Sequence, residues 1–369
     1  MSHKAGKEFF KYKREWSKRK DRILGSYLTA YLLKIATQKK PVLIVDGFAG
    51  PGVFRDGDPG SPLIVCQVIE AAVNKLSVDV SAIFIEPDDE LNLMLERTVR
   101  QYQFASVRKG LFSDFIDEIE KGAIDHNVFL YIDPFTVEGL VWDEIDRICR
   151  HLNVQGISVE LLMNFNAASF VRRGLAALQR TVPEIDESLE DTEQDRFELV
   201  DPPDLAKLNR VVGGEWWQDM LLEEAEFSLK VDNVSENLCL KLKNRFSEVC
   251  MHAMVAKPSH TIPKYYLIFA SRHPHALRLM NDEMLRSHQV LAEMAKPKYP
   301  TLFEMRSETL VPNLDRLPDS ICAQLPMPKK RGDLIIDVIR TEFGIYVSKD
   351  IRKAIENMLK SGVLKSQTG

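Results

Sequence analysis

Cysteine pairs, long apolar runs and repeats are what this sequence lacks. The five cysteines stand singly at positions 66, 149, 239, 250 and 322, and none forms a C-x-x-C pair. This spacing excludes a disulfide framework and a zinc site, and a metal centre is not expected. It is typical of a reducing compartment, so we expect a cytoplasmic location. No apolar run reaches the ~20 residues of a membrane span. The basic N-terminus has no apolar leader core, so export is not expected.

The net charge of -5 hides an uneven distribution of charged residues. Residues 1–25 are rich in Lys and Arg, whereas residues 184–226 are rich in Asp and Glu. A basic segment beside a near-neutral body favours nucleic-acid binding, and a solvated helix face gives the same pattern. Trp16 stands next to three cations, a mixture common in nucleic-acid contacts, although a core-facing Trp16 fits equally. The residues expected to contact nucleic acid are Lys18, Arg19 and Lys20.

The most informative stretch is residues 42–52, where four aliphatic residues precede an acid and a glycine-rich turn. The aliphatic run predicts a strand buried on both faces of a parallel sheet. Dinucleotide sites place a pyrophosphate on such a turn, and Asp46 would repel it. Arg55 also stands where the G-x-G-x-x-G pattern needs its last glycine.

An acid beside a glycine turn favours a cationic ligand instead. S-adenosylmethionine (SAM) carries an ammonium and a sulfonium, so the sequence predicts a SAM site. Glycine allows the tight turn and the close approach of the ligand that this site requires. The residues expected to bind SAM here are Asp46, Gly47, Phe48, Gly50 and Gly52.

Two later strand ends extend this predicted site. Glu86 ends a predicted strand over 81–86 and is expected to accept hydrogen bonds from ribose hydroxyls, as an acid also does in dinucleotide sites. Gly110, Leu111 and Phe112, at and after the end of a short strand over 106–110, are expected to flank the adenine through backbone and apolar contact. Helix capping or a loop position is the alternative for both acids, Asp46 and Glu86.

Asp133-Pro134-Phe135 follows a predicted strand over 127–132. Enzymes that methylate exocyclic amino groups of bases use an acid or amide, then proline, then an aromatic residue. Asp133 and the backbone near Pro134 would accept the amino hydrogens, and Phe135 would stack on the flipped base. The usual pattern has two prolines and this one has one. A strand-end turn with a core phenylalanine is the alternative.

Strands alternate with helices over residues 41–165, which predicts a doubly wound parallel α/β sheet. A helix over 8–38 precedes the sheet, as part of a basic N-terminal arm (1–40). The main domain is expected over 41–295, with an acidic helical insertion at 167–247. Two strands, 249–256 and 265–271, are expected to form an antiparallel pair of the kind found in SAM methyltransferases.

The C-terminal part has a different composition. Prolines mark a linker over 296–328. Residues 329–369 then read as helix, Gly344, a short strand over 345–347, and a second helix beginning at Ser348. This order is typical of a helix–turn–helix and predicts a winged-helix-like module.

Several motifs are spread over roughly residues 12–290. They are Trp16 and Lys20 ahead of Tyr27, the turn after Asp46, Gly60-Ser61-Pro62, Ile85-Glu86, Asp133-Pro134-Phe135, residues 161–165, residues 265–269 and His273-Pro274. Taken together, these motifs resemble the three-Cys-motif partner protein family (TcmP). The resemblance implies a Rossmann-like, SAM-dependent methyltransferase fold. It also implies a partner encoded nearby that carries a three-cysteine motif and looks like a radical-SAM-type protein.

Two functions follow as expectations. The first is a SAM-dependent methyltransferase acting on RNA or DNA, on a base amino nitrogen, with Asp133, Pro134 and Phe135 at the acceptor. The second is a non-catalytic SAM-binding adaptor that recognises nucleic acid for the cysteine-containing partner, and the single proline after Asp133 motivates it. A nicotinamide oxidoreductase ranks a distant third.

Overall fold

A computed structural model describes residues 12–73, 75, 78–182, 204–254, 262–294 and 313–366. The chain divides into two compact units, residues 1–272 and 273–369. Sequence analysis placed this boundary near residue 295. The helix α12 (Pro274–Met294) belongs to the second unit, where it packs against the helices α14 and α15.

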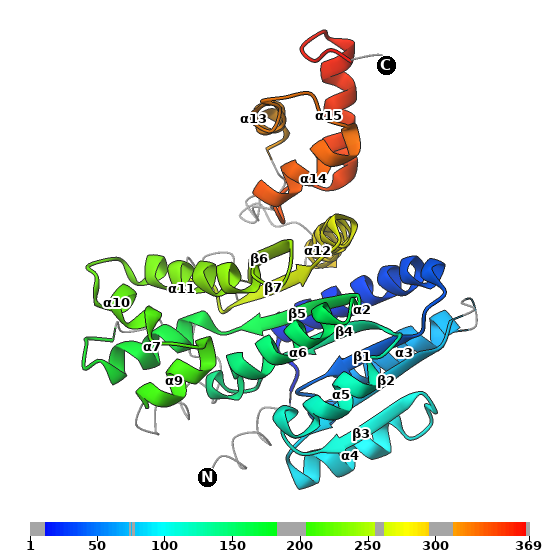
Figure 1. Cartoon of the computed structure of the whole chain (residues 1–369), viewed down its shortest axis with the longest axis vertical. Coiled ribbons are helices and arrows are strands. Elements are labelled where there is room, and N and C mark those ends of the chain that lie inside the picture. The colour runs from blue at the N-terminus through cyan, green and yellow to red at the C-terminus, as the bar shows by residue number, and fades with distance from the viewer. Residues whose placement is uncertain are drawn as a thin grey trace, which may run out of the picture. The chain divides into compact units, whose positions relative to one another are not determined.

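Within the described residues of the first unit, seven strands form one sheet in the order β3-β2-β1-β4-β5-β7-β6 (Figure 1). Strands β1 to β5 run parallel, and β7 runs antiparallel to both of its neighbours, β5 and β6. The predicted doubly wound sheet with an antiparallel pair is therefore confirmed, and the sheet is Rossmann-like. The strands are β1 (Val42–Asp46), β2 (Val80–Glu86), β3 (Ala105–Lys109), β4 (Asn127–Ile132), β5 (Val159–Phe165), β6 (Glu248–Met254) and β7 (Tyr265–Ser271).

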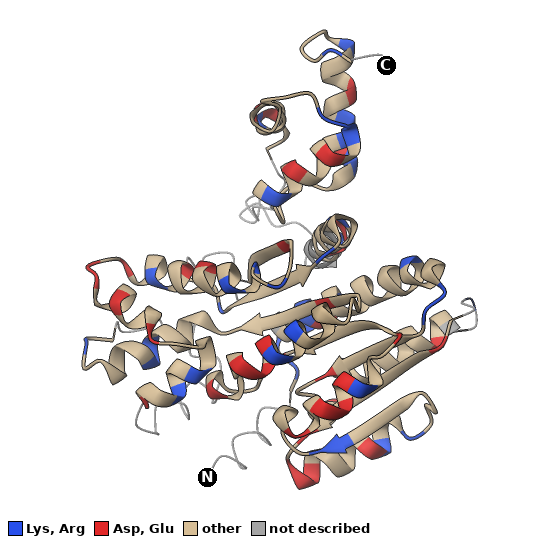
Figure 2. Ribbon diagram, viewed as in Figure 1, with Lys and Arg blue, Asp and Glu red and all other residues tan. Residues whose placement is uncertain are grey.

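Helices cover both faces of this sheet because its central strands are apolar on both sides. Leu43 and Val45 of β1 belong to one buried apolar cluster that also contains residues of α5, α6, α7 and α11. Charged residues lie mainly on the helices (Figure 2). The helices and helical turns of the first unit after β1 are α3 (Ser61–Val73), α4 (Asp89–Val99), η2 (Phe112–Phe115), α5 (Ile116–Gly122), η3 (Val137–Gly139), α6 (Trp142–Val154), α7 (Ala167–Ala177), α9 (Leu205–Val212), α10 (Trp216–Leu222) and α11 (Phe227–Leu242).

The N-terminal helix α2 (Glu15–Ile35) is part of the body of the first unit and not a separate arm; η1 (Ala36–Gln38) follows it. Tyr27 is fully buried, and its ring lies 5.8 Å from that of Phe129 on β4 and 5.3 Å from that of Phe269 on β7. Gly25 allows close approach to α3, because a β-carbon at this position would lie 3.1 Å from Ile64 Cγ2. An apolar stripe on this basic helix therefore fixes it to the sheet.

The described part of the acidic insertion is helical, as predicted, and consists of α7, α9, α10 and α11. Most of its acidic run lies outside the described residues. The second unit contains α12, η4 (Leu314–Arg316), α13 (Leu317–Ala323), α14 (Arg331–Thr341) and α15 (Ser348–Lys360).

Two local expectations for the second unit differ from the structure. Residues 314–323, assigned to a linker, form η4 and α13, because Leu317 and Ile321 give α13 an apolar side that is buried. The strand expected over 345–347 is a turn, since the described part of this unit offers it no strand with which to pair. The module is a helix–turn–helix in which no wing is described.

Candidate functional site

The strand order of the sheet reverses between β1 and β4. The chain moves outward from β1 through β2 to β3 and then returns to β4, on the other side of β1. Ligands of open α/β sheets bind at such a switch point, beyond the carboxyl ends of the strands. Asp46 is the last residue of β1, and Asp133 directly follows β4. Two predicted site residues thus flank the switch point.

The glycine turn after β1 is held between the two neighbouring strands. Gly47 donates its N–H to the Tyr131 carbonyl oxygen of β4 at 3.0 Å. Gly50 donates its N–H to Glu86 Oε2 at 2.9 Å, which ties the turn to β2. Gly52 has a φ of 79°, and a β-carbon there would lie 3.0 Å from Thr98 Cγ2. Both the backbone conformation and the space at this position therefore require glycine.

Asp46 is fully buried at the start of this turn. Its Oδ1 accepts a hydrogen bond from the Phe48 N–H at 3.1 Å, and its Oδ2 accepts one from the Ser61 hydroxyl at 2.7 Å. Burial raises the pKa of Asp46 to about 7, although these two hydrogen bonds oppose the shift. The Ser61 hydroxyl, at the start of α3, thus holds one oxygen of the Asp46 carboxylate. With its oxygens held by the protein, Asp46 acts on a ligand through its charge and through the turn that it fixes.

Glu86 lies at the end of β2, as predicted. Its Oε2 accepts the Gly50 N–H, and its Oε1 accepts the Asp88 N–H at 2.8 Å. Burial raises the pKa of this carboxyl, and the two backbone hydrogen bonds oppose the rise. Each carboxylate oxygen has two lone pairs, so Glu86 retains capacity for ribose hydroxyls while it holds the glycine turn.

The loop after β3 reaches the glycine turn through Phe112, the last residue of the stretch 110–112 that was expected to flank the adenine. Gly110 has a φ of 154°, and the Leu111 side chain is 59% exposed. Phe112 is buried, and its ring lies 6.3 Å from that of Phe48. A β-carbon at position 47 would lie 3.0 Å from the Phe112 ring. Phe112 therefore forms the apolar wall beside the glycine turn, whereas the Leu111 side chain is exposed to solvent.

Asp133 is held by three protein donors. Its Oδ2 accepts hydrogen bonds from the Lys20 ammonium and, at 3.2 Å, from the Tyr131 hydroxyl. Its Oδ1 accepts one from Asn164 Nδ2, at 2.8 Å. Asn164 lies near the end of β5, and its own Oδ1 is a buried atom without a hydrogen-bond partner in the described part of the chain. Sequence analysis missed Asn164 as a site residue, and its position near a strand end was the available signal.

Lys20 departs from its expected place in a nucleic-acid surface. It is 6% exposed and forms an ion pair with Asp133. Burial alone would lower the pKa of Lys20, but the charges of Asp133 and Asp21 outweigh it and raise this pKa. Lys13 in turn pairs with Asp21 at 2.6 Å. Lys20 on α2 is thus a buried cation paired with Asp133, and Lys13, just before this helix, is a buried cation paired with Asp21.

The other two predicted nucleic-acid contacts, Lys18 and Arg19, are half-buried. Lys18 lies 3.2 Å from Asp58, in the loop between β1 and α3. The side chain of Trp16 lies outside the described residues. These positions leave nucleic-acid contact by Lys18 and Arg19 a prediction.

Pro134 approaches the glycine turn from the side of β4. A β-carbon on Gly139 would lie 3.2 Å from Pro134 Cβ and 3.6 Å from Phe48 Cε1, so the loops after β1 and β4 meet there. Phe135 is half-buried, and its stacking on a base stays a prediction. The structure thus gathers Asp46, Phe48, Glu86, Asp133 and Pro134 along one edge of the sheet.

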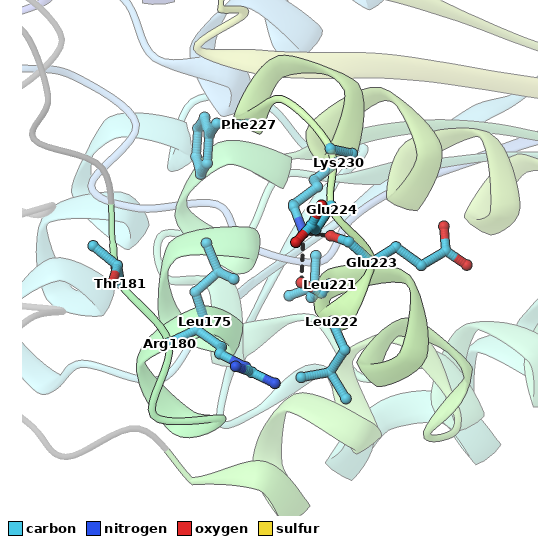
Figure 3. A pocket seen from close by; sticks show the side chains of 10 residues that line it. Leu175, Arg180, Thr181, Leu221, Leu222, Glu223, Glu224, Phe227 and Lys230 are labelled. Carbon is cyan, nitrogen blue, oxygen red and sulfur yellow. Dashed lines mark hydrogen bonds between the residues drawn. The ribbon is translucent and has the colours of Figure 1, made fainter.

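A cavity of about 260 Å³ lies elsewhere in the first unit, among α7, α10 and α11 (Figure 3). Lys230 is buried beside it and donates hydrogen bonds to the Leu221 carbonyl at 2.5 Å and to the Glu223 carbonyl. Its ammonium group therefore caps the carbonyl groups at the C-terminal end of α10. None of the predicted site residues lines this cavity.

No helix among the described residues is long and apolar enough to span a membrane. No family model matches the chain, and no curated protein matches it.

Several solved structures resemble it at low identity. A Legionella pneumophila protein is 10% identical (TM-score 0.40; 70% of this chain and 88% of that chain covered). Human methyltransferase-like protein 13 in complex with SAH is 10% identical (TM-score 0.34; 79% and 98%). A methyltransferase from Geobacter sulfurreducens is 16% identical (TM-score 0.22; 45% and 68%).

Proposed function

We propose that this protein is a SAM-dependent methyltransferase that acts on an exocyclic amino group of a nucleic-acid base. The observation that carries the proposal is the pair of buried carboxylates, Asp46 and Glu86, at the glycine turn beside the switch point of the sheet. The antiparallel strand β7 adds support, since it completes the strand pair that sequence analysis associated with SAM methyltransferases.

The charge of the site favours a cationic ligand. The acids Asp21, Asp46 and Asp133 face two cations, Lys13 and Lys20, in mutual electrostatic contact. Glu86 adds a further acid at the other side of the turn. Buried charges require compensation, because they have lost their hydration. SAM supplies two positive groups and one carboxylate, whereas a pyrophosphate would increase the repulsion.

Asp133 and Pro134 are the groups proposed to orient the acceptor amine. The amine nitrogen would attack the methyl carbon as the carbon–sulfur bond breaks, and S-adenosylhomocysteine would leave with the electron pair. The nitrogen must then lose one proton, to Asp133 or to water. Lys20, Tyr131 and Asn164 hold the Asp133 carboxylate in one orientation, and such fixed geometry is what positioning of an acceptor needs.

The test is transfer of tritium from methyl-labelled SAM to mixed RNA and mixed DNA. Asp133→Ala is expected to abolish transfer while SAM still binds, as measured by calorimetry. The matched control is Asp79→Ala, because Asp79 is exposed and precedes β2 at the opposite edge of the sheet. Unchanged transfer in Asp133→Ala would remove Asp133 from the mechanism, and absence of SAM binding by the unaltered protein would overturn the proposal.

A second function, a non-catalytic SAM-binding adaptor, is favoured by the contacts of Asp133. All three donors around its carboxylate belong to the protein, and a purely structural ion pair would show the same contacts. In this case the protein would bind SAM and a three-cysteine-motif, radical-SAM-like partner without transferring the methyl group. Stable co-purification with this partner, together with SAM binding and no transfer to any acceptor, would support the adaptor.

A further inference from the structure

The second unit contains two helices arranged as a helix–turn–helix. The helices α14 and α15 pack on each other and on α13, through buried residues such as Ile335, Ile339, Ile351 and Ile355. Residues 342–347 connect them, and Gly344 adopts a φ of 80° in this turn. A glycine-containing turn between two packed helices is typical of DNA-binding helix–turn–helix motifs.

The turn before α15 is anchored by two neighbouring residues of α12. Asn281 is fully buried, accepts the Gly344 N–H at 2.8 Å and donates to the Tyr346 carbonyl at 2.9 Å. Asp282 accepts the Ser348 N–H at 2.7 Å and also the Ser348 hydroxyl. These contacts fix where α15 begins and the direction in which it leaves the turn.

The outer face of α15 is mainly basic, and Glu356 on this face is paired with Arg331 of α14 at 3.3 Å. Lys349, Arg352, Lys353 and Lys360 are exposed, and none of them forms an ion pair within the part of the chain that the structure describes. Figure 2 shows lysine and arginine along this helix. Asn357 is exposed on the same helix. The inner face consists of buried residues, so the charged face is the one available to a partner.

We propose that α15 binds double-stranded DNA by entering its major groove. The 13 residues of α15 span about 20 Å, and its exposed cations extend over about 16 Å, at 1.5 Å per residue. A B-form major groove is about 12 Å wide and admits an α-helix, so cations at both ends of α15 can reach phosphates on its two sides. Asn357 lies between them, and asparagine pairs with the major-groove edge of adenine.

The same geometry argues against duplex RNA. The A-form major groove is deep and narrow, so side chains on a helix cannot read it. This inference rests on the proposed function, because it names the substrate class as duplex DNA. DNA binding by α15 nevertheless requires neither SAM nor methyl transfer, so each can be measured without the other.

The experiment is fluorescence anisotropy of the full-length protein with a labelled 24-base-pair DNA duplex, without SAM, over a series of salt concentrations. Arg352→Ala/Lys353→Ala removes two exposed cations from α15. Its matched control, Lys39→Ala/Lys40→Ala, removes two adjacent exposed cations from the first unit. The slope of log K against log salt is negative, and each lost phosphate contact makes it shallower by about 0.9. We therefore expect the α15 variant to bind DNA at least tenfold more weakly than the unaltered protein, with a salt slope shallower by about 2. The control variant should bind DNA within twofold of the unaltered protein.

Three results would overturn the inference. Equal weakening in both variants would show unspecific attraction to any surface cation. Equal or tighter binding of an RNA duplex of the same sequence would exclude major-groove entry. Absence of DNA binding by an unaltered protein that binds SAM would reject α15 as a DNA-binding element, but it would leave the methyltransferase proposal standing. Conversely, DNA binding without SAM binding would contradict the proposed methyltransferase function and would leave the inference about α15 standing. The unfolding temperature of the α15 variant should be unchanged, because both side chains are exposed.

Discussion

Asp46→Asn is expected to stabilise the first unit at alkaline pH and to weaken the binding of a cationic ligand at the candidate site. Asparagine has nearly the same shape, and its Oδ1 can still accept the Phe48 N–H. Its Nδ2 can donate to the Ser61 hydroxyl, which then acts as acceptor. The substitution therefore removes a buried charge without removing its hydrogen bonds, and such a change is expected to relieve the desolvation penalty.

The magnitude follows from the pKa of Asp46. Burial raises this pKa from 3.8 to about 7. The folded protein holds the proton more tightly than the unfolded chain, so stability from this group is lost as pH rises from about 4 to about 7 and stays level above. The difference between these two pKa values corresponds to a gain for asparagine of about 4 kcal/mol at pH 8, about 2 kcal/mol at pH 5 and almost none at pH 3.

The assay is urea denaturation at pH 8 and pH 5, followed by tryptophan fluorescence. All four tryptophans lie within residues 1–272, so the signal reports on the first unit. Asp133→Asn is the matched control, because the same chemical change there breaks a buried ion pair and is expected to destabilise by about 3–5 kcal/mol. The reasoning is refuted if Asp46→Asn is no more stable than the unaltered protein at pH 8, or if its gain is the same at both pH values.

Three further predictions concern the same edge of the sheet. The double variant Lys20→Met/Asp133→Asn should lose less stability than the sum of the two single variants, by more than about 1.5 kcal/mol, because it leaves no lone buried charge. Additive losses in urea denaturation would show that Lys20 and Asp133 do not stabilise each other. Glu86→Gln should weaken SAM binding about tenfold in calorimetry, since charge-assisted hydrogen bonds to the turn and the ribose are lost; an unchanged Kd would count against its role. Gly52→Ala should lower the unfolding temperature more than Gly57→Ala, because both have positive φ but a β-carbon at position 57 meets nothing within 4 Å; equal losses would show that crowding is unimportant.

The central strands could be predicted closely from the sequence because their physical signal is local. The strands β4 (Asn127–Ile132) and β7 (Tyr265–Ser271) match the expected ranges, since a continuous apolar run is what burial on both faces of a sheet requires. Asp46 and Glu86 were located for the same reason, as carboxylates that end such runs. The antiparallel direction of β7 followed from its short distance in sequence from β6.

The role of Lys20 could not be predicted in this way. Composition counts a lysine as a surface charge, and Asp133, its partner, lies 113 residues later in the chain. No local pattern records such a pairing, because it arises when α2 packs across the completed sheet. The prediction of a proline-rich linker over 314–323 was wrong for a related reason. Proline breaks a helix interior but is favoured in the first turn, and Pro318 stands at the start of α13.

The stability cost of Asp46 and its attraction for a cation have one physical origin. An ionised carboxylate that has lost its hydration is unfavourable until a positive group approaches it, so a cationic ligand should lower the pKa of Asp46 as it binds. At pH 7, where Asp46 is about half protonated, SAM binding should release up to about half a proton more from the unaltered protein than from Asp46→Asn. Calorimetry in two buffers of different ionisation enthalpy measures this difference, and the variant accounts for protons that SAM itself releases. Equal proton release from both proteins would mean that the ligand does not sense the charge at the end of β1.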